Sequence, residues 1–488
     1  MSDAVQLFAK QKRIYPRRVW GRYRKLKWAA MITLLGIYYS APWLRWHRGE
    51  HAPDQAILID MPSRKAYFFG IEIWPQEVYY LTGLLILGAV GLFAVTSLFG
   101  RVWCGYACPQ TVWTDLFVWV ERIVQGDRNA RKKLDESPLG FEKIRKKAIT
   151  HLIWLIIAMC TGGAWVFYFN DAPTLLDQII HLDVPLSVGG WILALTFSTY
   201  LMAGYAREQV CTYMCPYARF QSAMFDKNTL IIAYDEKRGE PRGKWKELQA
   251  LMARSADHAS HEPANAALHG EGSSLSREQL KTRGHCIDCD SCVVVCPMGI
   301  DIRNGLQMEC IACGLCVDAC NNVMDKIGLP RGLIRYETES KEPFTLFRAR
   351  SFWYAGILSA VGGLMLYGLM TRAELDLNVI HDRNPLLVKL SDGAVRNGYT
   401  VHIINKTHED HRYRLLVHGL DYRELHVEGA GNLSADSLPV FADSVGQFRI
   451  YITAAKQSDP RQGITFEVRD SMSGEISSSE SIFVSERP

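Results

Sequence analysis

Two closely spaced runs of cysteines constrain the fold of this chain more than any other feature of its sequence. Eight of its thirteen cysteines lie within 35 residues. In each run, three cysteines are separated by two residues each, and a fourth follows after three more. The first run consists of Cys286, Cys289, Cys292 and Cys296, and the second consists of Cys310, Cys313, Cys316 and Cys320.

This spacing is typical of bacterial ferredoxins with two [4Fe–4S] clusters, in which the fourth cysteine of each run binds the cluster of the other run. Disulfide bonds and zinc also use closely spaced cysteines, but zinc sites usually consist of two separated pairs. One departure is that Asn321, not proline, follows the second run. We therefore expect single-electron transfer. The expected ligands are Cys286, Cys289, Cys292 and Cys320 for the first cluster, and Cys310, Cys313, Cys316 and Cys296 for the second.

Five apolar runs predict a membrane protein. Four of them reach the roughly 20 uncharged residues that cross the hydrocarbon of a bilayer, whereas the first is shorter and contains Pro42. A soluble core helix rarely extends that far without a charge. The five runs span residues 28–44, 78–100, 148–170, 184–206 and 351–371.

Basic residues predict the orientation of these helices. Nine lysines and arginines precede residue 28, the loop 101–147 is also basic, and residues 171–185 contain neither residue type. By the positive-inside rule, the N-terminus, this loop and the cysteine runs lie in the cytoplasm, and the fifth helix carries the C-terminal part across the membrane. No cleavable signal is evident, so we expect the first helix to remain as an uncleaved anchor.

Four other cysteines form a repeated motif. Cys104 and Cys108, and then Cys211 and Cys215, each form a Cys-x3-Cys-Pro sequence with a tyrosine between the two cysteines. The motifs are offset by 107 residues, which indicates a duplicated two-helix hairpin. Each motif lies at the predicted cytoplasmic end of its apolar run.

The prolines of these motifs predict how the chain continues. Proline suits the first turn of a helix, so Cys108 and Cys215 are expected to cap short helices at residues 111–124 and 218–225. The helix dipole favours the thiolate form of such a residue. If the hairpins pack around a pseudo-twofold axis, four thiolates converge on a site suited to Cu(I), zinc, an iron–sulfur cluster or a redox-active disulfide. Alternatively, these cysteines only fill apolar space, which is our expectation for Cys160.

The twin Cys-x3-Cys-Pro motifs, the ferredoxin segment before a fifth helix and the exported tail together resemble the FixG/CcoG family. Its members are membrane polyferredoxins that assist assembly of cbb-type cytochrome c oxidase, and the resemblance covers essentially the whole chain. It implies reduction of Cu(II) to Cu(I) with electrons from the two clusters. It also implies contact with the oxidase or its assembly factors, and transfer of Cu(I) to a copper chaperone or a copper-transporting ATPase. The implied copper ligands are Cys104, Cys108, Cys211 and Cys215.

The C-terminal part predicts a β-sandwich, in line with the immunoglobulin-like domain of that family. Apolar residues alternate with period two in six short segments, and Asn397-Gly398, Ser391-Asp392-Gly393 and Ser473-Gly474 are expected turns. We interpret five histidines here as surface residues: His402, His408, His411, His418 and His426. The expected strands are residues 385–390, 401–404, 413–417, 448–452, 464–468 and 482–484.

The expected domain order follows from these features. His258, His261 and His269 lie in a polar insert that we interpret as a solvated linker. Only His151 lies inside a predicted membrane run, which argues against b-type haem. The domains are a basic N-terminus (1–27), four membrane helices with both motifs (28–235), the insert (236–284), the ferredoxin module (285–340), the fifth helix (351–371) and the β-sandwich (375–488).

Two other functions remain open at this point. One is a quinol-linked electron conduit without a metal substrate, in which the Cys-x3-Cys-Pro pairs are structural or redox elements. The other is a non-catalytic assembly scaffold whose exported domain docks on the oxidase. The sequence carries no Gly-rich nucleotide fingerprint after a strand that would identify the electron donor, and no feature indicates nucleic-acid binding.

Overall fold

The computed structural model describes residues 13–49, 52–244, 284–428, 434–457 and 459–485. The chain forms two compact units. The first comprises Met1–Leu44 and Ile57–Gly363, and the second comprises Arg45–Ala56 and Leu364–Pro488. The three histidines of the predicted insert, His258, His261 and His269, lie outside the described residues.

Four helices of the described chain are long and apolar enough to cross a membrane. They agree with four of the five predicted runs. The fifth candidate, α1 (Arg22–Ser40), is a helix whose first turns carry four basic residues, and it is not among the four, so the predicted count of five is not confirmed. The four are α2 (Tyr79–Phe99), α6 (Phe141–Val166), α8 (Leu186–Thr199) with its π-helical continuation η3 (Tyr200–Ala206), and α15 (Ala349–Met370).

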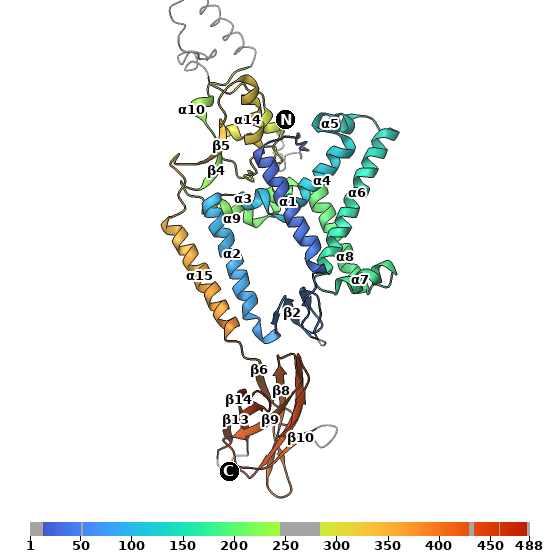
Figure 1. Ribbon diagram of the computed structural model, residues 1–488, viewed down its shortest axis with the longest axis vertical. Coiled ribbons are helices and arrows are strands. Elements are labelled where there is room, and N and C mark those ends of the chain that lie inside the picture. Colours follow the sequence, from blue (N-terminus) through green and yellow to red (C-terminus); the bar gives the residue numbers. More distant parts are fainter. Residues whose placement is uncertain (1–12, 50–51, 245–283, 429–433, 458, 486–488) are drawn as a thin grey trace, which may run out of the picture. The chain divides into compact units, whose positions relative to one another are not determined.

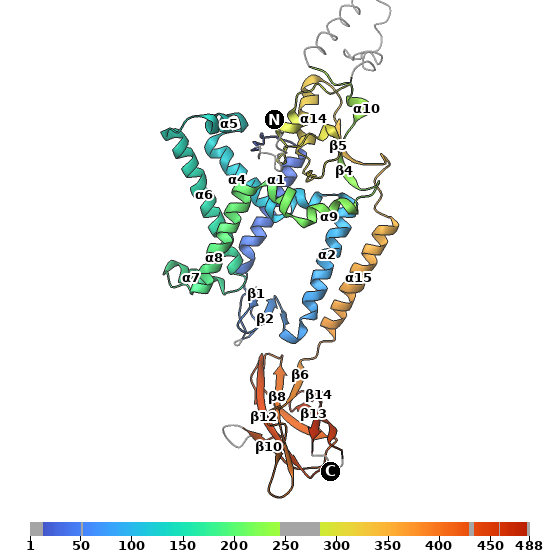
Figure 2. The same cartoon turned by 180° about the vertical axis from the view of Figure 1, so that it is seen from behind.

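Helix α4 (Pro109–Gln125) packs beside α6 and the end of the fourth apolar run, as Figures 1 and 2 show. Its amphipathic sequence buries one face, where Phe117 stacks on Trp154 of α6 with ring centroids 5.2 Å apart. Short elements connect this part of the unit. They are η1 (Ala41–Trp43), a sheet of β1 (Ile57–Asp60), β2 (Lys65–Phe68) and β3 (Ile71–Ile73), η2 (Pro75–Glu77), α3 (Val102–Tyr106), α5 (Arg128–Glu136), α7 (Ala172–Ile180), η4 (Val210–Met214) and α9 (Pro216–Met224).

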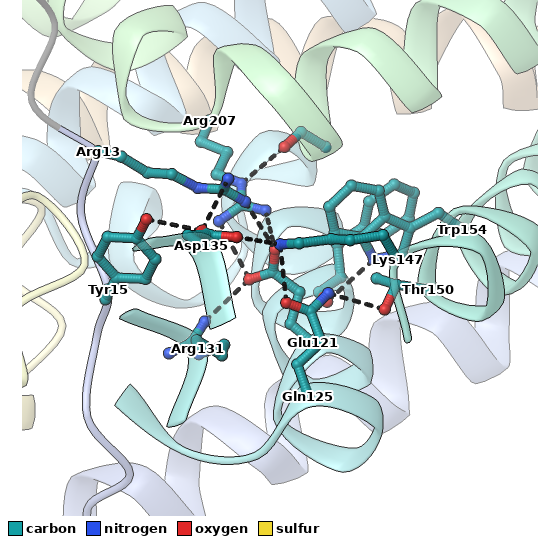
Figure 3. A network of polar contacts seen from close by, with 12 residues as sticks. Arg13, Tyr15, Glu121, Gln125, Arg131, Asp135, Lys147, Thr150, Trp154 and Arg207 are labelled. Atoms are coloured by element: carbon teal, nitrogen blue, oxygen red, sulfur yellow. Dashed lines mark hydrogen bonds and ion pairs between the residues drawn. The ribbon is translucent and has the colours of Figure 1, made fainter. Parts of the chain in front are cut away.

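A buried carboxylate organises the polar side of this bundle (Figure 3). Glu121 of α4 is 1% exposed and binds Arg207 at 2.7 Å, Arg131 at 2.8 Å and Arg13 at 3.3 Å. Burial alone would raise the pKa of Glu121, but the three guanidinium groups outweigh burial and hold that pKa below its ordinary value. The carboxylate therefore ties the N-terminal segment, α5 and the chain after η3 to a single helix.

In both halves of the repeat, the residue that follows the membrane helix has nearly the same backbone conformation. Gly100 has φ 60° and ψ −132°, and Arg207, which lies 107 residues later, has φ 42° and ψ −115°. These angles are costly for a residue with a side chain, so Arg207 is held there by its surroundings, including its bonds to Glu121. The equivalence supports the predicted duplication.

The cysteine runs form one folded module within the first unit. Strand β4 (Leu230–Tyr234) precedes the insert and pairs antiparallel with β5 (Ile334–Thr338), which follows the second run. The core of the module includes Met324, Leu333 and Ile334. The other elements are α10 (Glu236–Gly239), α13 (Ser291–Val294), η5 (Ile302–Asn304) and α14 (Leu315–Ile327).

The N-terminal segment joins this module to the helices. Asp318 of α14 is 4% exposed and accepts hydrogen bonds from the backbone N–H groups of Tyr23 at 3.3 Å and Arg24 at 2.8 Å, at the start of α1. It thus satisfies two of the N–H groups that a helix start leaves unpaired. The guanidinium of Arg24 in turn binds Asp115 of α4 at 2.8 Å.

The second unit is a β-sandwich, as predicted. Its sheets have the orders β10-β12-β8-β6, with β7 beside β8, and β11-β9-β13-β14. Tyr399 and Phe466, both fully buried, meet between the sheets with centroids 5.0 Å apart. The strands are β6 (Leu375–His381), β7 (Val388–Lys389), β8 (Val395–Asn405), β9 (His411–His418), β10 (Tyr422–Glu428), β11 (Leu438–Val440), β12 (Ser444–Ala454), β13 (Arg461–Asp470) and β14 (Ile476–Val484).

Two predictions for this unit are wrong. Asn397-Gly398 is not a turn but lies inside β8, where the buried Asn397 side chain exchanges two hydrogen bonds with the backbone of Val484. His411 is not a surface residue, because it is 8% exposed and binds Asp470 at 2.7 Å. The other four histidines, His402, His408, His418 and His426, are exposed or half-buried, and β6, β10 and β11 were not predicted.

Replacement of the buried carboxylate tests the role of the network. Glu121→Gln should lower the free energy of unfolding by about 3–5 kcal/mol, because it leaves three guanidinium groups without their shared partner. Thermal and denaturant unfolding of the detergent-solubilised protein provides the measurement. As a control, Asp325→Asn removes the exposed partner of Arg331 and should leave stability nearly unchanged. Equal stability of both variants would contradict the role assigned to Glu121.

Candidate iron–sulfur and thiol sites

Four cysteine thiols from both runs line one cavity of the module. Its lining includes Tyr234 and Met324, so the thiols face a largely apolar space. Arg303, which no sequence motif marks, also lines it and binds Asp288, Asp290 and Asp301 at 2.6–2.7 Å. The cysteines of this cavity are Cys286, Cys289, Cys292 and Cys320.

A second cavity gathers the other four thiols. Cys292 of the first set also lies in its lining, and so do Ile302 and Met298. Four thiols around an apolar space are the donor set that a [4Fe–4S] cluster requires, so the residues present fit two such clusters. The remaining cysteines of this cavity are Cys296, Cys310, Cys313 and Cys316.

The two loops that bear these thiols have the same backbone pattern. Asp288 and Asp290 in the first run have φ near +50°, and the residues 24 positions later, Ala312 and Gly314, have φ 49° and 73°. Left-handed residues at equal positions bend both loops in the same way. Burial raises the pKa of Cys292, Cys296 and Cys320 to about 12, so iron must displace the protons of these thiols on binding.

The Cys-x3-Cys-Pro motifs fold as predicted at their prolines. Cys108 and Cys215 are the N-cap residues of α4 and α9, which begin at Pro109 and Pro216. These helices start two residues earlier than the predicted ones, because proline occupies the first helical position.

The residues after the two prolines form hydrogen bonds between the two halves of the repeat. Gln110 donates hydrogen bonds to the carbonyls of Met202 at 2.9 Å and Arg207 at 3.1 Å, at the end of the fourth apolar run. The equivalent Tyr217 shares a hydrogen bond of 2.6 Å with the Thr96 hydroxyl near the end of α2. Each short helix therefore contacts the membrane helix of the other half, as a pseudo-twofold arrangement requires.

The four thiols of these motifs lie near one another. Burial, and then the proximity of Cys108, Cys104 and Cys215, raises the pKa of Cys211 to about 12. Burial also raises the pKa of Cys104 to about 11, although a hydrogen bond to Gln221 opposes this rise. Within the described residues, no group of three His, Cys, Asp or Glu side chains has the arrangement of a single-ion site. Cys160 is exposed on α6 and belongs to neither group of thiols.

Gln221 of α9 is a functional candidate that the sequence did not reveal. It is fully buried, its Oε1 accepts a hydrogen bond of 3.4 Å from Cys104, and its Nε2 has no hydrogen-bond partner. An unpartnered buried donor is unusual. The amide is therefore placed to donate to a thiolate or to a group that thiolates bind.

The first thiol motif packs directly on the loop of the second cysteine run. A Cβ atom on Gly105 would lie 2.7 Å from the Ile311 carbonyl oxygen and 3.1 Å from the Cα of Cys313, so only glycine permits this approach. Tyr106 donates a hydrogen bond of 3.0 Å to the Cys313 carbonyl. Cys104 packs against the apolar group that contains Cys313. The two groups of thiols are thus neighbours.

The comparisons with known proteins agree with this architecture. A family model described as "4Fe-4S dicluster domain" matches residues 206–339, and one described as "4Fe-4S binding domain" matches residues 81–126. A third, an "IG-like fold at C-terminal of FixG", matches residues 365–486. With the four apolar helices, these matches define a membrane iron–sulfur protein of the electron-transfer class.

Relatives identify the family. Nitrogen fixation protein FixG of Rhizobium meliloti is 44% identical and covers 96% of this chain and 92% of its own length. Protein RdxA of Cereibacter sphaeroides is also 44% identical, over 95% of this chain and 94% of its own length. The ferredoxin-type protein NapH of Haemophilus influenzae is 20% identical, over 66% of this chain and 94% of its own length. The chain belongs to the FixG/CcoG family.

Paired substitutions test the predicted exchange of fourth ligands between the clusters. If Cys286 and Cys320 bind the same cluster, the double variant Cys286→Ala/Cys320→Ala should lose one cluster and keep about four of about eight iron atoms per chain. Cys286→Ala/Cys296→Ala should then damage both clusters and lose nearly all iron. Iron analysis and EPR of the dithionite-reduced protein give the result, with Cys160→Ala as a control that keeps its iron. If Cys286→Ala/Cys320→Ala instead loses nearly all iron and Cys286→Ala/Cys296→Ala keeps about half of it, each run binds its own cluster.

Proposed function

We propose that the four thiols of the Cys-x3-Cys-Pro motifs bind copper and that single electrons from the cysteine module reduce it from Cu(II) to Cu(I). The observation that carries this proposal is the packing of Cys104 and Gly105 on the Ile311–Cys313 loop. Electron transfer over such a short path needs no mobile carrier. The iron–sulfur clusters, when bound, supply electrons one at a time.

The chemistry of the thiols suits this reaction. Cu(II) takes up one electron and becomes Cu(I), and no bond of the protein chain breaks. Thiolates prefer the softer Cu(I), so their binding favours the reduced product. The buried amide of Gln221 supports the same assignment, because its Oε1 accepts from the Cys104 thiol and its unpartnered Nε2 is a donor that can stabilise a thiolate.

The proposal extends to location and partners. We place the protein in a bacterial inner membrane, with the N-terminus and the cysteine module in the cytoplasm and the immunoglobulin-like unit in the periplasm. Its Cu(I) would serve assembly of a cbb-type cytochrome c oxidase, either through assembly factors or through a copper chaperone or copper-transporting ATPase. The basic segments before α1 and in the 101–147 loop support this orientation.

A second function has one specific observation in its favour. The family model over residues 81–126, which contain Cys104 and Cys108, is described as binding a [4Fe–4S] cluster. In this alternative the four thiols hold a third cluster, and the protein is an electron conduit without a metal substrate. The iron content separates the two functions, because the conduit contains about twelve iron atoms per chain and the copper reductase about eight.

Copper reoxidation tests the proposed reaction. The dithionite-reduced protein, freed of excess reductant, should be reoxidised by Cu(II) with one Cu(I) formed per electron released. Cys104→Ser/Cys211→Ser should abolish this reaction and keep the iron content, because it removes one thiol from each motif. Cys160→Ser is the matched control and should react like the parent protein. Unchanged copper reduction in the double variant would refute the assignment of these thiols.

The close approach at Gly105 yields a separate prediction. Gly105→Ala places a methyl group against the Ile311 carbonyl, so the module must shift away from Cys104. The rate of Cu(II)-dependent reoxidation should fall several-fold while the iron content stays the same. Gly88→Ala in α2, where a Cβ meets no atom within 4 Å, is the control. Equal rates in both variants would mean that this contact does not carry the electrons.

A further inference from the structure

Arg101 lies between the cysteine module and the first thiol motif. It is 5% exposed, and its guanidinium donates to three backbone carbonyls. One of these belongs to Ala218 of α9, at 2.5 Å, and the others belong to Met308 and Cys310 in the loop that enters the second cysteine run. The side chain therefore spans from a helix of the thiol motifs to the loop of one cluster.

The charge of Arg101 has no carboxylate partner in the described part of the chain. Two other buried arginines near the thiols differ in this respect. Arg303, at the first cavity, binds three aspartates, and Arg207, in the second half of the repeat, binds both oxygens of Glu121. Burial of a guanidinium that lacks a counter-ion is unfavourable unless negative charge is present nearby.

Two thiol groups can supply that negative charge. The guanidinium of Arg101 donates to the carbonyl of Cys310, whose thiol lines the second cavity, and Arg101 is the N-cap residue of α3, which contains Cys104 of the thiol motif. A single cation thus acts on both groups of thiols. The residue at the equivalent position of the second half, 107 residues later, is Glu208, so the duplication did not retain this charge.

We propose that Arg101 is a shared counter-ion, which raises the midpoint potential of the cluster at Cys310 and stabilises negative charge at Cys104. Reduction adds one negative charge to that cluster, and a nearby buried cation stabilises the reduced form. Arg101 is a positioning residue, because it acts through the two sites and not on a reacting atom. The proposal rests on the cluster at Cys310 and not on copper chemistry, so failure of copper reduction would leave it standing.

Redox titration with dithionite, followed by EPR, tests this role. Arg101→Gln should shift the midpoint potential of one cluster to a more negative value and leave the other unchanged. Arg101→Lys keeps the charge and should retain most of the parent potential. Lys326→Gln removes an exposed charge on α14 of the same module and should move neither potential.

A second variant covers the case in which Arg101→Gln does not fold. Ala218→Glu introduces a carboxylate in the first turn of α9, where the helix dipole favours it, and gives Arg101 a partner without removing the side chain. The same cluster should again become harder to reduce. If both variants accumulate with full iron and leave both potentials unchanged, Arg101 is only a clamp between the loop and α9, and the proposal is wrong. A shift at both clusters alike would also overturn it.

Discussion

The arrangement of the first unit depends on the hydrogen bonds between the Asp318 carboxylate and the start of α1. Asp318 belongs to α14 of the cysteine module, yet it caps the first N–H groups of α1. A buried carboxylate at a helix start gains both hydrogen bonds and a favourable interaction with the helix dipole. Because Arg24, in the same turn, binds Asp115 of α4, this short segment connects the module to α4. The packing of Gly105 on the Ile311–Cys313 loop is a second contact between the module and the helices.

The parts of the structure that could be predicted from the sequence are those determined by residues close together in the chain. The spacing of eight cysteines predicts two sets of four ligands, and the structure brings the thiols of each predicted set to one cavity. Prolines after Cys108 and Cys215 determine where α4 and α9 begin. Long apolar runs predict the four membrane helices because length and absence of charge are sufficient criteria.

The parts that could not be predicted depend on contacts between residues distant in sequence. Asp318 is separated by 294 residues from Arg24, and no local pattern marks it as a cap. Asn397-Gly398 has the composition of a turn, but the backbone of Val484 satisfies its amide inside a strand. Helix α1 combines four basic residues with an apolar second half, so composition alone does not decide whether it crosses the membrane. At Asp318 and Asn397, tertiary contacts outweigh local propensity.

The duplicated hairpin does not produce a symmetric thiol site. Gly100 and Arg207 share a backbone conformation, and Gln110 and Tyr217 make equivalent contacts across the repeat. The following positions differ, because Arg101 faces the loop of Cys310, whereas Glu208 lines a cavity with Cys211. The first half therefore presents a basic residue to the cysteine module, and the second half presents an acidic residue. Each half of the repeat contributes two thiols, but the equivalent positions 101 and 208 carry opposite charges, so the two sides of the thiol site differ electrostatically.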